Sequence, residues 1–166
     1  MVKDFLPAKS KDELMKMLEN DQVAAAFEAL ANPLHEELYK RQTFNFLDEL
    51  PQVQQVVLAF DYIQNQAGQG GFIQLIQNGY ISLLVTVIEG LQAMDIAPEM
   101  VLLLDNVLKV YVLNREALDK ETSVEEFSKL YEEFKEFEAL DTRFEALRQE
   151  TMAGIIKEYL KYAVMS

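Results

Sequence analysis

The chain has 166 residues, no cysteine and a formal net charge of −13 at pH 7. This length fits one domain, and half of the residues are hydrophobic, which is enough for a sizeable core. Without cysteine there is no disulfide and no thiolate metal site. The charge argues against direct binding to nucleic acid or an anionic membrane, because such binding needs Lys and Arg to neutralise phosphates. It favours attraction to basic proteins instead.

The N-terminus lacks the apolar run of a signal peptide. Tyr80 to Ile88 is the longest nearly unbroken apolar run, and it is far too short to span a bilayer. We therefore expect a single cytoplasmic domain over residues 1–166, without a membrane partner. Within it, 1–50 form N-terminal helices and 51–166 form the rest.

The N-terminal third reads as three helices. Ser10 and Glu13 have the spacing of a capping box at the start of the first. Asn32-Pro33 predicts the end of the second, because proline suits the first turn of a following helix. The third is expected over Leu34 to about Leu50. His35, the only histidine, is expected at the surface, since no second histidine stands four residues away to make a helical metal site.

The middle of the chain is expected to form two long helices around a glycine-rich corner. Pro51 opens one helix, whose apolar residues recur at helical spacing as Val53, Val56, Val57, Phe60 and Ile63. Tyr80 to Met94 is the other, chosen over a strand because it is long and does not alternate. Gly90 within it suggests close packing against a neighbour.

Two further long helices follow. Pro98 opens a helix that is expected to reach about Leu118, with Val112 on its inner side. Ser123 and Glu126 form a second capping box, before a helix with a heavily aromatic face that includes Phe127 and Tyr131. Asp141 is expected to cap the last helix. The sequence thus predicts an all-α fold, an irregular bundle of about seven to nine helices.

The corner between the two middle helices holds Gly68, Gly70 and Gly71, which are expected to break the preceding helix. Phe72 begins a short apolar helix and is expected to anchor in the core. We assign the corner a structural role, because phosphate loops follow a strand and carry a lysine. The glutamines of this stretch, like Gln69, are expected to bind neighbouring backbone. The predicted corner motif consists of Gly70, Gly71, Phe72, Gln74, Asn78 and Gly79.

These residues, together with Asn65, resemble the Asn-Gly-Gly-Phe, Gln, Asn pattern of a bacterial family of helical proteins. The similarity continues to Leu140-Asp141, Phe144 and Tyr159-Leu160, so that it covers about residues 50 to 162. The best-described member of that family is a DNA mimic. The resemblance therefore implies a protein that binds a DNA-binding protein in place of DNA.

Acidic residues concentrate late in the chain. Residues 116 to 150 hold twelve acids and five bases, a net charge of −7. Glu132 and Glu136 would lie about 6 Å apart along one helix, a spacing compatible with a row of phosphates. Lys129 and Lys135 are expected to pair with these acids along the helix. The predicted partner-binding residues are Glu125, Glu132, Glu133, Glu136 and Asp141. The N-terminal acids Glu13, Glu19, Glu36 and Glu37 are the alternative surface.

Three functions stay open at this stage. The first is an acidic interaction domain that occupies the DNA-binding surface of a basic transcription factor. The second is a structural or regulatory homodimer whose acidity is incidental. The third is an enzyme, which we do not expect, because the chain has no cysteine nucleophile, no histidine pair and no phosphate-loop lysine. No catalytic residue, metal or cofactor is predicted.

Overall fold

The computed structural model describes residues 7, 9–119 and 124–165, and within them it contains eight α-helices, one 3-10 helix and no strand. This confirms the all-α prediction of about seven to nine helices. The elements are α1 (Lys11–Glu19), α2 (Val23–Arg41), η1 (Phe44–Glu49), α3 (Gln52–Gln77), α4 (Ile81–Met94), α5 (Pro98–Leu113), α6 (Arg115–Leu118), α7 (Val124–Glu133) and α8 (Glu136–Met165).

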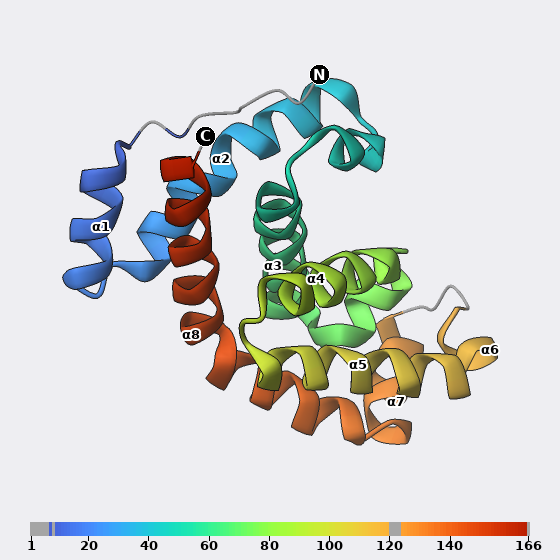
Figure 1. Cartoon of the computed structure of the whole chain (residues 1–166). Coiled ribbons are helices and arrows are strands. Elements are labelled where there is room, and N and C mark those ends of the chain that lie inside the picture. The colour runs from blue at the N-terminus through green and yellow to red at the C-terminus, as the bar shows by residue number, and fades with distance from the viewer. Residues whose placement is uncertain (1–6, 8, 120–123, 166) are drawn as a thin grey trace.

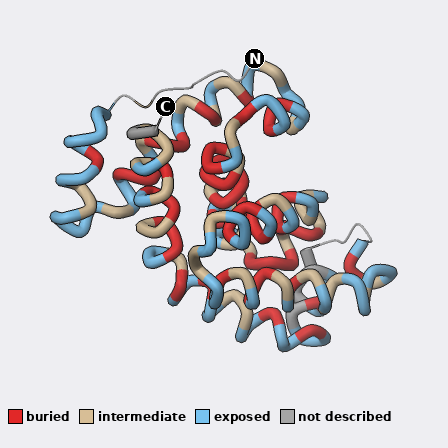
Figure 2. The backbone as a smooth tube through the Cα atoms, in the orientation of Figure 1, coloured by how far each residue is buried: buried red, intermediate tan, exposed pale blue. Residues whose placement is uncertain are grey.

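Helices α3 and α8 organise the bundle (Figure 1). Helix α3 packs chiefly against α4 and α8, while α8 runs past α1, α2, α3 and α5. The buried residues gather where these helices meet, and the outer faces of α1 and α5 are exposed (Figure 2). The long α8 therefore packs against both the N-terminal helices and the helices of the later part of the chain.

The predicted apolar stripe of α3 is buried, from Val53 to Ile63. The burial goes further than a stripe, because every residue from Val56 to Phe60 is buried as well. A helix that is apolar on all sides belongs at the centre of a fold. This explains why neighbours cover α3 on several faces.

The expected helix end at Asn32-Pro33 is wrong, because α2 continues through Pro33 to Arg41. Proline inside a helix costs about 3 kcal/mol or more through a lost hydrogen bond and a steric clash. Leu30, Ala31 and Leu34 are buried on both sides of it, and this packing favours a continuous helix. The helix expected over Leu34 to Leu50 is therefore replaced by the end of α2 and the short η1.

The helix that Pro98 opens also ends earlier than expected. Asn114 interrupts it after Leu113, and its side-chain Nδ2 donates to the carbonyl of Val110 at 2.9 Å. The short α6 follows. Val112, expected on the inner side, is 58% exposed. The buried residues of α5 all lie in its first three turns, between Met100 and Val107.

The capping box at Ser10 and Glu13 is present in α1, as predicted. The second predicted box begins at Ser123, which lies outside the described residues. The predicted close packing at Gly90 is confirmed. A Cβ atom added there would lie 2.1 Å from Cγ2 of Val56, which is fully buried on α3.

Replacement of Gly90 by alanine is expected to lower the free energy of unfolding by about 1–3 kcal/mol, the usual cost of overpacking a core. The contacted methyl belongs to a β-branched side chain, which cannot rotate away easily. Urea denaturation followed by circular dichroism measures the change. The double variant G90A/V56A is the control. If it is no more stable than the sum of the two single changes predicts, the Gly90–Val56 contact is not the cause.

In the described part of the chain no single helix is long and apolar enough to cross a membrane. Helices α3 and α4 meet the criterion of length and composition only together, as a pair bent by 110°.

Candidate functional site

The backbone of the glycine corner turns at two residues. Gly70 has φ −146° and ψ 18°, and Gly71 has φ 73° and ψ −173°. Gly68 stays within the helix, so two of the three glycines make the break. The combination at Gly71 is essentially restricted to glycine. The helix then resumes at Phe72 and changes direction without a loop.

Side-chain amides tie the two limbs of the corner together. Oε1 of Gln66 accepts hydrogen bonds from Nδ2 of Asn78 at 2.8 Å and from Nε2 of Gln74 at 3.4 Å. Oε1 of Gln69 accepts a second bond from Gln74, at 3.2 Å. Gln69 and Gln74 thus bind each other, although each was expected to bind backbone. Gln77 does reach backbone, since it donates to the carbonyl of Leu118.

Phe72 is fully buried, as expected for a core anchor. Its ring lies edge-to-face against Phe144 of α8, with the centroids 5.3 Å apart. Phe144 in turn packs against Phe60, at 5.8 Å, on the other limb of α3. The corner, the first limb of α3 and α8 are therefore held by one aromatic cluster.

Asp141 has a different place from the one predicted. Helix α8 begins at Glu136, so Asp141 lies inside it and does not cap it. Its Oδ1 atom accepts a hydrogen bond from the backbone N–H of Phe72, at 2.9 Å. That N–H opens the helical segment after the corner, where no preceding turn supplies a carbonyl. Asp141 thus caps a helix 69 residues away in sequence.

Replacement of Asp141 by alanine should therefore cost about 1–3 kcal/mol of stability, because a buried N–H loses its charged acceptor. Asparagine keeps an acceptor oxygen at the same place and should cost less. Thermal and urea unfolding of the two variants test this. Equal stabilities of D141A and the parent would show that the bond contributes nothing.

The acidic face consists of Glu125, Glu132, Glu133 and Glu136, all of them exposed, on α7 and at the start of α8. Behind it Leu130, Phe134 and Phe137 are buried. The side chains of Phe127 and Tyr131 lie outside the described residues. The predicted separation of acids from apolar residues thus holds where the side chains are described.

The acids were predicted to lie on one helix, and this prediction is wrong. Helix α7 ends at Glu133 and α8 begins at Glu136, so an axial spacing of 6 Å between Glu132 and Glu136 does not apply. The Phe137 N–H donates to the carbonyl of Phe134 at 3.1 Å, which forms a tight turn. This turn lets both phenyl rings enter the core, edge-to-face at 6.4 Å.

The carboxylates of the acidic face also lack the expected cations. Among the described residues no Lys, Arg or His nitrogen lies within 4.0 Å of Glu125, Glu132, Glu133 or Glu136. The predicted pairs with Lys129 and Lys135 are therefore absent. On the alternative surface, by contrast, Glu37 pairs with Arg41 at 2.9 Å and Glu13 with Lys9 at 3.8 Å.

A second feature was missed in the sequence. His35, expected at the surface, is partly exposed there, but its partner was not predicted. Its Nε2 lies 2.6 Å from Oδ2 of Asp61 on α3, and it lines a pocket of about 720 Å³. Asp61 stands 26 residues further along the chain, and no local spacing connects the two. The described residues, those of this pocket included, contain no group of three or more His, Asp or Glu side chains that could hold a metal ion.

The family model for DMP19-like protein matches residues 48–163, which is more than half of the chain. This range nearly coincides with the resemblance seen in the sequence, and it includes the glycine corner and the acidic face. Comparison with curated proteins gave no match, and comparison with solved structures gave none either. The chain belongs to the DMP19-like protein family.

Proposed function

We propose that this protein is an acidic interaction domain that mimics DNA and occupies the DNA-binding surface of a basic transcription factor. Membership of the DMP19-like family supports the choice of a DNA-binding partner. The observation that carries the proposal is the set of exposed glutamates on α7 and α8 whose carboxylates have no cationic nitrogen of the described residues within 4.0 Å. We propose no catalytic activity and no cofactor.

Unpaired carboxylates suit this role for a physical reason. A DNA-binding surface presents Lys and Arg side chains that neutralise phosphates. A carboxylate that is not already paired with a cation of its own chain offers its whole charge to such a surface. All four glutamates of the acidic face meet this condition among the described residues. On the alternative surface Glu13 and Glu37 are already paired, which leaves only Glu19 and Glu36 unpaired there within the described part of the chain. The acidic face is therefore the better candidate for contact with the partner.

Conversion of Glu132, Glu133 and Glu136 to glutamine tests this surface. Glutamine keeps the shape but removes the charge, so we expect the fold to stay intact and association with the partner to slow. The partner is first captured from a native lysate. Binding is then measured over a salt series, because screening shortens to about 8 Å near physiological ionic strength.

In the matched control, glutamine replaces Glu19, Glu28 and Glu36. This removes the same charge from exposed sites on α1 and α2. We expect it to bind nearly as fast as the parent at physiological salt. If the control is the weaker binder and the first variant is not, the partner contacts the N-terminal helices. Equal binding by all three proteins would refute an electrostatic interface.

Exposed apolar residues on α5 support a second candidate, a homodimer. Leu102 is 60% exposed and Leu113 is 82% exposed, with Val112 beside it. Sedimentation equilibrium of the parent and of L102S/L113S distinguishes the two. A dimer that dissociates in the variant supports this candidate, and a monomeric parent rejects it.

A further inference from the structure

The pocket at His35 lies where α2, η1 and α3 meet, outside the acidic face. Its volume of about 720 Å³ lies within the range of small-molecule sites. Most of its lining precedes the region that the family model matches, and Tyr62 is the member from α3. The lining residues are His35, Glu36, Leu38, Tyr39, Lys40, Gln42, Thr43, Phe44 and Tyr62.

The aromatic side of the pocket is fixed by its own packing. Phe44 and Tyr62 lie edge-to-face with their centroids 5.1 Å apart, and Tyr80 packs behind both, at 5.8 and 5.1 Å. Burial, and then a hydrogen bond to Tyr80, raises the pKa of Tyr62 above the ordinary tyrosine value. The wall is therefore pre-formed and uncharged at neutral pH.

The polar side presents one oriented imidazole. His35 is fixed by Asp61, whose other oxygen accepts a hydrogen bond from Nε2 of Gln64 at 2.7 Å. An ionised carboxylate only accepts hydrogen bonds, so the neutral imidazole must donate from Nε2, which leaves Nδ1 as an acceptor. No described residue bonds to Nδ1.

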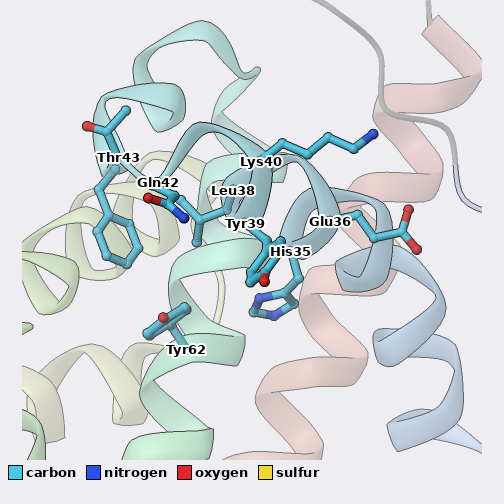
Figure 3. Close-up of a pocket in the computed structure, with 9 residues that line it drawn as sticks. His35, Glu36, Leu38, Tyr39, Lys40, Gln42, Thr43 and Tyr62 are labelled. Carbon is cyan, nitrogen blue, oxygen red and sulfur yellow. The ribbon is translucent and has the colours of Figure 1, made fainter.

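The charged residues of the lining stand apart from this interior. Glu36 and Lys40 line the pocket, but their side chains extend away from Tyr62 (Figure 3). The chain carries a net charge of −13, which disfavours an anionic ligand. A ligand would therefore meet the flat rings of Phe44 and Tyr62 on one side and the acceptor Nδ1 of His35 on the other.

We propose that this pocket binds an uncharged planar aromatic compound that carries an N–H donor. The ring packs against Phe44 and Tyr62, and the N–H donates to Nδ1 of His35. This site is separate from the acidic face, so it stands or falls independently of the proposed function.

The only histidine of the chain is its own reporter. Its imidazole proton signal is followed by NMR while the protein is titrated with indole, with 1-methylindole, which has the same ring without the donor, and with tetramethylammonium. The ¹⁵N shifts of the imidazole in the same sample identify the nitrogen that carries the proton. We expect a saturable shift with indole, and binding of 1-methylindole weaker by roughly twofold to tenfold, the effect of one hydrogen bond.

Two variants separate the ring contact from the hydrogen bond. Phe44→Leu keeps an apolar side chain without a flat face, and should weaken indole binding severalfold while the histidine signal stays that of a folded protein. His35→Phe should abolish the preference for indole over 1-methylindole, as seen by saturation transfer to the ligands. If either variant unfolds, the proposal is tested by the affinities of the parent protein for indole and 1-methylindole.

Three results would overturn the proposal. One is the lack of a saturable shift with indole up to its solubility. Another is equal affinity of the parent for indole and 1-methylindole, which would remove the acceptor role of His35. The third is tighter binding of tetramethylammonium than of indole, which would make the rings a cage for cations.

Discussion

Replacement of Phe72 by alanine is expected to lower the free energy of unfolding by about 3–5 kcal/mol. The phenyl ring is fully buried and packs against Phe144, so its removal leaves a cavity at the junction of α3 and α8. Such a loss is a large part of the stability of a typical domain, about 5–15 kcal/mol. Urea unfolding monitored by circular dichroism measures it.

The matched control is Phe72→Leu, which refills most of the volume and should cost clearly less than alanine. An unchanged unfolding midpoint for Phe72→Ala would mean that the ring does not hold the corner against α8.

Replacement of Gly71 by valine should have the second large effect. The backbone at Gly71 has φ 73° and ψ −173°, a conformation that costs other residues of order 1–3 kcal/mol. Valine, with its branched Cβ, is expected to lie at or above the upper end of that range. The corner must then either strain or unwind, and the Phe72 N–H loses its alignment with Asp141.

Gly68 provides the control in the same stretch. It lies within the helix, and a Cβ atom added there would meet nothing within 4 Å. Alanine at Gly68 should therefore be neutral or stabilise the fold by about 0.5–1 kcal/mol. If Gly71→Val and Gly68→Ala melt at the same temperature, the conformation of Gly71 is not a requirement of the fold.

The helices could be predicted because their signals are local. The cap at Ser10, the stripe of α3 and the glycine pair each depend on residues within a few positions of one another. Pro33 misled the prediction for the opposite reason. Whether a helix ends at a proline or continues through it depends on how well the flanking residues pack, and that packing involves other helices.

The candidate sites were predictable only in part. The exposure of Glu132 and Glu136 follows from the aromatic spacing around them, but the turn between α7 and α8 does not. The contact of Asp141 with Phe72 and that of His35 with Asp61 join residues 69 and 26 positions apart. Neither pair has a spacing that a sequence pattern could reveal, because the bundle itself brings the partners together.

The proposed DNA mimicry is tested most directly by competition for the captured partner. A fluorescent DNA duplex bound to that partner is titrated with the parent protein and with the variant E132Q/E133Q/E136Q, and its anisotropy is followed. We predict that the parent displaces the duplex and that the triple variant needs a clearly higher concentration to do so. If the anisotropy stays high or rises when the parent binds, duplex and protein occupy different surfaces, and the protein does not act as a DNA mimic.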